Sequence, residues 1–246
     1  MVLNILRSIN KGTDKGNLPA QHVPHVFDCV PAKREAYMSL WEKYDRDDGR
    51  TADPMRVLHL INLVETANTL QDGHYIELGV HRGFTLRIIH QTMDRNKALY
   101  GLDTFTGFDP RDVQVERNLY PDNGTKYGFH PTSLEGVRKY LADGGDAKNV
   151  ELIKGWFPQT FAGLEGFRWR FVHIDFDLYE PVRQAMNLLW PNIVVGGVML
   201  VHDYGCLGFP GVKIAVDQFA KAQGVFPVQL ADRWGSVVFR KPHSSA

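Results

Sequence analysis

From residue 53 onward, short apolar segments alternate with segments whose apolar residues recur at helical spacing, and this alternation restricts the fold more than any other feature. The first five apolar segments have the length and composition of buried strands, and they lie at 75–78, 98–102, 150–153, 170–174 and 198–201. Strands that alternate with helices along the chain are typical of an α/β fold with a parallel sheet. The sequence therefore predicts a doubly wound, mostly parallel, Rossmann-like sheet.

Two further strand-like segments follow at 226–230 and 236–240. Only the turn at 231–235 separates them, whereas a parallel crossover needs about a dozen residues or more. We therefore expect an antiparallel hairpin in the C-terminal part of the chain, which brings the predicted sheet to seven strands.

The N-terminal part of the chain lacks this alternation, so we divide the chain into an extension, 1–52, and a main domain, 53–246. A helix is predicted at 31–44 inside the extension, and a Thr132–Glu135 capping box predicts the start of another helix. The segment 104–131 has neither helical nor strand periodicity, and irregular segments of this length are often functional. We expect the extension and this segment to close over a ligand; for the extension, a purely structural role is equally open.

The net charge of the chain is zero, with 28 Lys and Arg against 28 Asp and Glu. This balance argues against nucleic acid or an anionic membrane as a partner. The longest apolar stretch, 193–201, is too short to span a membrane, and two cysteines suit a reducing compartment better than a disulfide framework. We expect a cytoplasmic globular protein; a homo-oligomer stays open.

A glycine turn follows the first predicted strand, in the segment Glu77 to Thr85. Gly79 lets the backbone turn sharply beside a ligand, and Gly83 allows close packing where the next helix begins. The G-x-x-x-G spacing differs from that of most dinucleotide sites and no Walker lysine follows, so a ligand without a pyrophosphate is favoured. Glu77 would repel a phosphate but suit an ammonium or sulfonium group. An ordinary tight turn explains these residues equally well.

Asp103 ends the second predicted strand, where a carboxylate can accept hydrogen bonds from both hydroxyls of a ribose. The alternative is a helix N-cap. Because the glycine turn and this acid stand at the ends of consecutive strands, we favour an adenosine-type ligand. The acid before the glycine turn indicates S-adenosylmethionine rather than NAD. Further cofactor contacts are predicted at Gly83, Thr85, Thr104, Gly155 and Asp175.

Asp175 and Asp177 follow the fourth predicted strand, and His202 and Asp203 follow the fifth. Asp175 and Asp177 share one side if the strand continues that far, and neighbouring parallel strands would bring all four side chains together. Carboxylates in one cleft repel each other unless a cation, a shared proton or a basic side chain compensates them. A bound divalent metal is the simplest remedy, and capping of the following helices is the structural alternative. His173 is interpreted as a hydrogen-bonded core histidine.

A resemblance to the macrocin O-methyltransferase family rests on four segments, at 75–83, 101–108, 173–181 and 201–205. The most specific of them contains the run Asp-x-Asp-x-Tyr-Glu, and the resemblance covers about residues 70 to 240. Members of this family are class I enzymes that use S-adenosylmethionine to methylate sugar hydroxyls, often on antibiotics. The resemblance implies the same fold, cofactor and activity for the domain at 53–246.

By position, the resemblance also implies a magnesium site formed by Asp175 and two consecutive acids after the fifth strand, with Asp177 as general base. The first of those two positions is His202 in this chain, and only Asp203 is acidic. An imidazole would weaken magnesium binding or favour a softer metal. Alternatively the site lacks a metal and His202 itself deprotonates the acceptor. The cofactor contacts that the resemblance implies are Glu77, Gly79 and Asp103.

We therefore predict an O-methyltransferase that acts on a hydroxyl of a sugar or a glycosylated natural product, with Asp177 or His202 as the base. A phenolic or catechol-like acceptor is the alternative among enzymes. Outside enzymes, the alternative is a catalytically silent partner protein that binds the cofactor. The cluster of acids and His202 discriminates the two classes, because a silent binder has no reason to retain it.

Overall fold

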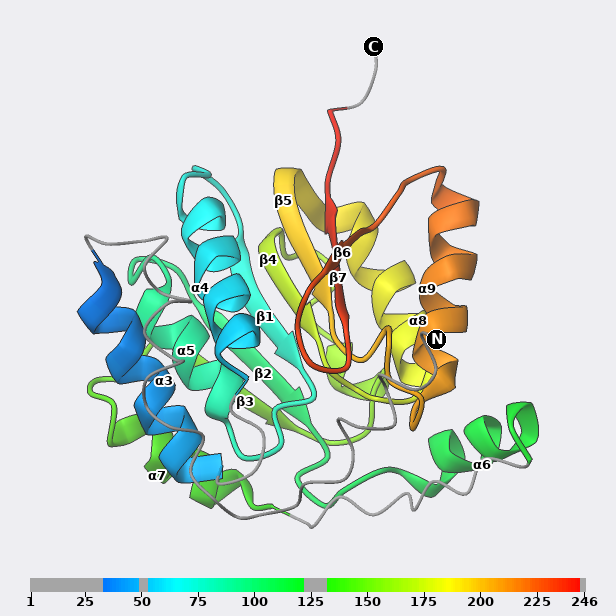
Figure 1. Ribbon diagram of the computed structural model, residues 1–246, viewed down its shortest axis with the longest axis horizontal. Coiled ribbons are helices and arrows are strands. Elements are labelled where there is room, and N and C mark those ends of the chain that lie inside the picture. The colour runs from blue at the N-terminus through cyan, green and yellow to red at the C-terminus, as the bar shows by residue number, and fades with distance from the viewer. Residues whose placement is uncertain (1–32, 49–52, 122–131, 244–246) are drawn as a thin grey trace, which may run out of the picture.

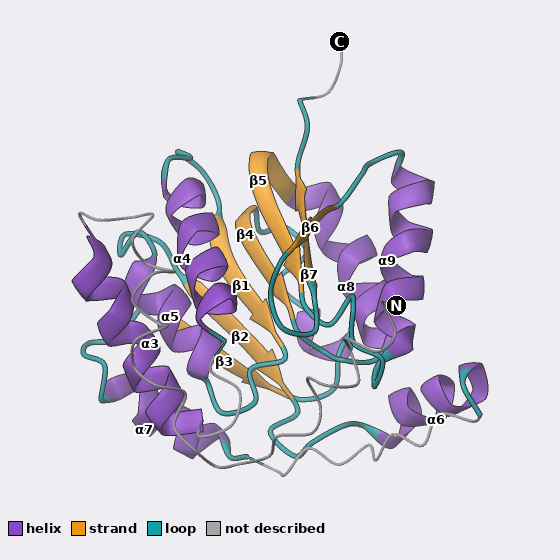
Figure 2. Cartoon of the chain, viewed as in Figure 1, coloured by secondary structure: helices purple, strands orange, loops and turns teal. Residues whose placement is uncertain are grey.

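The computed structural model of the chain describes residues 33–48, 53–121 and 132–243, and its centre is a seven-stranded sheet with helices on both faces (Figures 1 and 2). The strand order is β3-β2-β1-β4-β5-β7-β6. Neighbouring strands among β1 to β5 are parallel, and β7 is antiparallel to both β5 and β6. The predicted fold is therefore confirmed. Its strands are β1 His74–Leu78, β2 Leu99–Asp103, β3 Val150–Lys154, β4 Trp169–Ile174, β5 Ile193–Val201, β6 Val228–Leu230 and β7 Ser236–Arg240.

Successive residues of the central strands point to opposite faces of the sheet, and each face has its own hydrophobic core. Tyr75 of β1 belongs to the core beneath α4 (Pro54–Asn68) and α5 (Phe84–Thr92). Its neighbour Ile76 belongs to the core beneath α8 (Tyr179–Leu189) and α9 (Pro210–Gln223). The sheet is thus covered on both sides, which explains why its parallel strands are apolar throughout.

Two more helices, α3 (Arg34–Asp48) and α7 (Leu134–Ala142), lie on the same side as α4 and α5 (Figure 1). The helix predicted at 31–44 corresponds to α3, whose Tyr37 is buried in that core. Residues 1–32 lie outside the described residues, and the role of 1–52 as a lid stays a prediction. Two short 3-10 helices also occur, Gln159–Phe161 and Trp190–Asn192.

Helix starts follow the capping signals with one correction. Asp53 caps α4, since its carboxylate accepts a hydrogen bond from the Met55 N–H at 3.0 Å, and Pro54 is the first helical residue. The cap of α7 is Ser133, whose hydroxyl accepts from the Gly136 N–H, and not Thr132 as the predicted capping box required. The Thr132 hydroxyl instead donates to the main-chain carbonyl oxygen of His81.

The segment 104–131 contains a helix that its periodicity did not reveal, α6 (Pro110–Leu119). Asp109 caps it, and the buried residues of the helix are Asp112, Val113 and Glu116. Because two of these three are acidic, the buried face carries no apolar stripe, and the prediction of an irregular segment was wrong for this part. Residues 122–131 lie outside the described residues.

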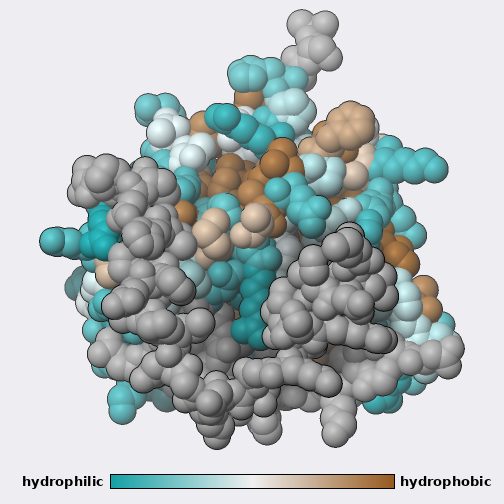
Figure 3. Space-filling view, in the orientation of Figure 1, coloured by the Kyte–Doolittle hydropathy of each residue, from teal (hydrophilic) through white to brown (hydrophobic). Residues whose placement is uncertain are grey.

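Two strands differ from their predicted bounds by more than one residue. β5 begins at Ile193 rather than at 198, and its pairing with β4 changes register near Gly196, whose φ is +79°. β6 begins at Val228 rather than at 226, and Phe226 is 91% exposed. In Figure 3 hydrophobic surface gathers in the part of the view where Figure 1 places β5 and β6. No helix in the described part of the chain is long and apolar enough to cross a membrane.

Candidate active site

A cavity of about 300 Å³ lies at the carboxyl ends of the parallel strands, where α/β sheets bind their ligands. Residues from the segments after β1 to β5 line it. Two further contributions come from elsewhere in the chain, Arg56 from α4 and Trp234 from the turn between β6 and β7. The predicted site residues that line this cavity are Gly79, Thr85, Asp103, Thr104, Gly155, Asp175, Asp177, His202 and Asp203.

The glycine turn brings the segment after β1 against the segment after β4. Gly79 has a φ of +89°, and a Cβ added to it would lie 2.1 Å from the carbonyl oxygen of Asp175. Only glycine fits such a close approach of two main chains. Gly83 has a φ of +84° and begins α5, where it packs against Val137 of α7. Gly83 lies outside the cavity lining and allows close packing there, so its predicted contact with the cofactor stays a prediction.

Asp103 ends β2 and uses both carboxylate oxygens to hold the turns around it. Its Oδ2 accepts a hydrogen bond from the His81 N–H at 2.8 Å, and its Oδ1 accepts from the Phe105 N–H at 2.6 Å. Each carboxylate oxygen has a second lone pair that can accept from a ligand hydroxyl. The position in the cavity wall is therefore compatible with the predicted contact to a ribose.

Glu77 lies inside the sheet and is fully buried. Its Oε1 is 2.7 Å from Nδ1 of His173, the histidine that we interpreted as a core residue. Burial raises the pKa of the Glu77 carboxyl, although the contact with His173 works in the opposite direction. Glu77 is not among the residues that line the cavity, so its predicted contact with a cofactor stays a prediction.

The wall formed by α6 carries an acid that the sequence did not point to. Asp112 lines the cavity, and one of its carboxylate oxygens accepts a hydrogen bond from the Trp156 indole N–H at 2.9 Å. Burial raises the pKa of Asp112 to about 6, despite that hydrogen bond. Trp156 also stacks beneath Arg111, whose guanidinium carbon is 3.6 Å from the ring centroid. Trp156 and Gly155 follow β3, so this contact joins the segment after β2 to the segment after β3.

Glu116 connects α6 to the helices that follow β4 and β5. Its two oxygens accept from the Tyr179 N–H at 2.8 Å and the Gly211 N–H at 3.0 Å, at the first turns of α8 and α9. Neither helix has a side-chain cap of its own. A Cβ on Gly211 would lie 2.3 Å from Glu116 Oε2 and 2.7 Å from Tyr179 Cβ, so glycine is needed there. Glu116 therefore holds together the two segments that carry the acids of the site.

The acids after β4 and β5 gather as predicted, but for a different geometric reason. β4 ends at Ile174, so the strand does not continue to Asp177, and that premise of the prediction was wrong. Asp177 and Asp203 instead have φ values of +62° and +61°, which are uncommon for residues other than glycine. Both of these turns lie at the cavity, where Asp175 joins them.

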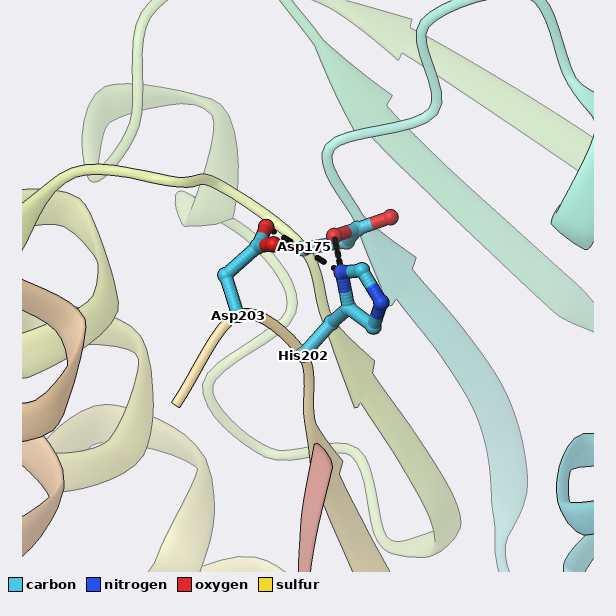
Figure 4. A group of neighbouring side chains, drawn as sticks. All are labelled: Asp175, His202 and Asp203. Carbon is cyan, nitrogen blue, oxygen red and sulfur yellow. Dashed lines mark ion pairs between the residues drawn. The ribbon is translucent and has the colours of Figure 1, made fainter. Parts of the chain in front are cut away.

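His202 lies between two carboxylates, as Figure 4 shows. Its Nδ1 is 3.0 Å from Asp175 Oδ1 and 3.1 Å from Asp203 Oδ2. Burial and Arg56 both oppose a charge on the ring, but the carboxylates of Asp203 and Asp175 outweigh them and raise the pKa of His202 to about 9. The imidazole is therefore positively charged near neutral pH.

The carboxylates of the cluster differ in their proton affinity. Burial, together with the nearby Asp203 and Asp175, raises the pKa of Asp177 well above its usual range. Burial also acts on Asp175, but there Arg56 and His202 outweigh it and hold the pKa well below the usual range. Asp177 is thus the carboxyl group of this pair that binds a proton more readily.

Arg56 is the member of the cluster that the sequence analysis missed. Its Nη2 is 2.5 Å from Asp175 Oδ2, and the side chains of Arg56 and Asp175 are 10% and 18% exposed. Arg56 lies in the first turn of α4, next to Val57 and Leu58, which are buried. A charged residue inside so apolar a helix was the available signal, but its partner lies 119 positions away and no local pattern reveals it.

The donor atoms of Asp175, His202 and Asp203 lie within 4.8 Å of one another, which is close enough for one metal ion to reach all three. Magnesium, however, prefers six oxygen ligands, and this group offers an imidazole nitrogen between two carboxylates. Arg56 and His202 also already face both oxygens of Asp175. The residues present therefore do not fit a magnesium site.

The sheet order, the glycine turn after β1 and the acid that ends β2 define the class I methyltransferase fold. Solved structures of that class agree. The chain has a TM-score of 0.62 to the O-methyltransferase NovP, with 22% identity over 77% of this chain and 81% of that one. Its TM-score to the calicheamicin methyltransferase CalS11 is 0.60, with 21% identity over 74% and 77% of the two chains.

Within that class, the model of the family described as Macrocin-O-methyltransferase (TylF) matches residues 50–241, so the chain belongs to this family of enzymes. A relative in Streptomyces olivaceus is the 8-demethyl-8-(2,3-dimethoxy-alpha-L-rhamnosyl)-tetracenomycin-C 4'-O-methyltransferase, 29% identical over 71% of this chain and 68% of its own length. Another is the demethyldecarbamoylnovobiocin O-methyltransferase of Streptomyces niveus, 26% identical over 77% of this chain and 78% of its own length. The predicted family is confirmed.

Proposed function

We propose that this protein transfers the methyl group of S-adenosylmethionine to a hydroxyl of a sugar that is part of a natural product. Membership of the macrocin O-methyltransferase family carries this proposal. The name of one relative specifies a rhamnosyl-bearing tetracenomycin as its acceptor, and that of another a novobiocin precursor. The cavity at the strand ends supports the proposal because the glycine turn, Asp103 and the cluster of acids after β4 and β5 all line it.

The segments after β1, β2 and β3 suit the cofactor. Gly79 lets a ligand approach the main chain, Asp103 offers carboxylate oxygens to a ribose, and Thr104 and Gly155 lie beside it in the cavity wall. When bound, S-adenosylmethionine supplies a methyl group on a positively charged sulfur. The acids after β4 and β5 favour a ligand that carries such a charge.

A sugar hydroxyl is a weak nucleophile, so a base must take its proton as the methyl group is transferred. We assign this role to Asp177, because it lines the cavity and because its pKa is raised by burial and by Asp203 and Asp175. A carboxylate of raised pKa accepts a proton more strongly. His202 is the weaker choice, since at a pKa of about 9 its ring already carries both protons near neutral pH.

Incubation of the protein with radiolabelled S-adenosylmethionine and a panel of acceptors tests the proposal. The panel contains rhamnosyl and other deoxysugar conjugates, the matching aglycones and a catechol. We expect label in at least one glycoside and none in its aglycone. Transfer to the catechol alone would favour a phenolic acceptor. Tight binding of the cofactor without transfer to any acceptor would favour a silent binding protein and contradict the proposal.

A further inference from the structure

We propose that the guanidinium of Arg56 is the permanent cation of the acid cluster, in the place that a divalent metal ion would otherwise take. The inference rests on the proposed function only for its activity measurements, because metal binding is measured without an acceptor. It makes Arg56 a residue that positions Asp175, and it predicts a methyl-transfer site that works without a metal.

The first argument is the occupancy of the Asp175 carboxylate. Arg56 Nη2 is 2.5 Å from Oδ2, and His202 Nδ1 is 3.0 Å from Oδ1. Both oxygens that Asp175 would offer to a metal ion therefore already face nitrogen atoms. An ion that bound to this carboxylate would have to displace a contact that is largely withdrawn from water, and such contacts are costly to break.

The second argument is the fixed position of Arg56. It lies in the first turn of α4, where the Asp53 carboxylate accepts from the Met55 N–H at 3.0 Å and from the Arg233 N–H at 2.6 Å. The second of these bonds ties the start of α4 to the turn that carries Trp234, another residue of the cavity wall. The main chain that carries Arg56 is therefore held in place by hydrogen bonds at the start of α4.

The third argument is the charge of the whole cluster. Asp175, Asp177 and Asp203 bring three carboxyl groups to the cavity, and Arg56 and His202 are the basic side chains of the described residues that contact them. Arg56 is the one of the two that keeps its charge at every physiological pH. Its removal would leave Asp175 with His202 as its only ionic partner among the described residues.

Titration of the full-length protein with Mn²⁺, followed by the electron paramagnetic resonance of the free ion, tests the inference directly. We expect no binding in the micromolar range, and methyl transfer that is unchanged after EDTA treatment. Stoichiometric Mn²⁺ binding by the natural protein at micromolar concentration would overturn the inference. This result does not depend on whether the acceptor has been found.

Two variants sharpen the test. The double variant Arg56→Gln/His202→Asp removes both cations and adds an oxygen donor, whereas His202→Asp alone keeps Arg56 as the matched control. We expect the double variant to bind Mn²⁺ about ten- to a hundredfold more tightly than the control, a range typical of changes beside a metal ligand. Equal affinities would contradict the inference. Circular dichroism establishes that both variants fold, and if either does not, the titration of the natural protein decides.

A further pair separates charge from packing. Arg56→Lys keeps a positive charge near Asp175, and Arg56→Gln keeps most of the volume without the charge. We expect Arg56→Lys to retain more activity than Arg56→Gln, and Mn²⁺ to restore part of the activity of Arg56→Gln only. If the two variants have equal activity and neither responds to Mn²⁺, Arg56 serves packing alone and the inference fails.

Discussion

The two halves of the cavity are built by different physical means. On the side of β1 and β2, glycine turns and main-chain hydrogen bonds to Asp103 shape the wall. On the side of β4 and β5, ionic contacts among Asp175, His202, Asp203 and Arg56 do so. In our proposal, the first half receives the cofactor and the second half takes the proton of the acceptor hydroxyl.

This difference implies that changes in the two halves have different effects. Changes beside β1 and β2 should weaken binding of the cofactor and leave the chemical step intact. Changes beside β4 and β5 should slow the chemical step and alter its pH dependence. Three substitutions test this division, in order of decreasing expected effect, and two substitutions of acids at α6 then test stability.

Asp177→Asn should have the largest effect, a fall in kcat of about a thousandfold, because loss of a general base costs roughly 10²–10⁴-fold. The raised pKa of Asp177 also predicts that activity of the natural protein falls on the acid side as this carboxyl binds a proton. That acid limb should vanish in the variant. Steady-state kinetics from about pH 5 to 9, above the ordinary aspartate pKa of about 4, measure both effects.

Asp217→Asn is the control for Asp177→Asn, because Asp217 is an exposed acid paired with Lys213 on α9. Its kcat should equal that of the natural protein. If Asp177→Asn keeps full kcat and still loses activity at low pH, another group is the base, and His202 is the next candidate.

Gly79→Ala should have the next largest effect, because its Cβ would meet the Asp175 carbonyl oxygen at 2.1 Å. We expect affinity for S-adenosylhomocysteine to fall about a hundredfold by calorimetry, an estimate that converts to roughly 2.7 kcal/mol. Gly163→Ala is the matched control, since Gly163 has a φ of +91° with no atom within 4 Å of the added Cβ. The control Gly163→Ala therefore shows the cost of backbone strain alone, about 1–2 kcal/mol, without the steric clash. Equal affinities in the two variants would show that crowding at Gly79 is unimportant.

Asp103→Asn should weaken cofactor binding by about tenfold and leave kcat unchanged, because an amide has one acceptor oxygen where the carboxylate has two. The amide nitrogen would then face the N–H of either His81 or Phe105. Asp146→Asn, at an exposed acid that also accepts from a main-chain N–H, is the control. A fall in kcat with unchanged affinity would break the division between the halves.

Asp112→Asn should have the smallest effect and should act on stability. The folded pKa of about 6 lies above the unfolded value of 3.8, so the stability that this carboxyl contributes is present below pH 3.8 and is lost as pH rises through 6. The variant keeps an acceptor for Trp156, so at pH 8 it should melt roughly 2–4 °C higher than the natural protein. At pH 4 the two proteins should have the same melting temperature.

Asp109, the N-cap of the same helix, has the opposite dependence of stability on pH. Its hydrogen bond with Arg111 lowers the pKa of the Asp109 carboxyl, so its contribution is present above the unfolded value and is lost as pH falls through the folded one. Asp109→Asn should therefore lower the melting temperature at pH 8. Thermal unfolding of both variants across this pH range measures the contrast, and shifts of equal sign at pH 8 would refute it.

The fold was largely predictable because its signals are local. Each strand is a short apolar segment, and the closing hairpin follows from the short turn at 231–235. The glycine turn and Asp103 were found for the same reason, since each stands at the end of its own strand. What the sequence could not reveal depends on distant partners or on polar buried faces. Arg56 meets Asp175 across the chain, and α6 buries Asp112 and Glu116 in place of an apolar stripe.

Glu116 restricts how the segment that contains α6 can be exchanged for that of a relative. A Cβ on Gly211, which lies in a different helix, would displace this carboxylate from its bonded position and would also meet Tyr179 Cβ at 2.7 Å. A graft of 104–121 from a relative is therefore compatible with this scaffold only if the acid and the glycine travel as a pair. The two positions act as one structural unit, although 95 positions of sequence separate them.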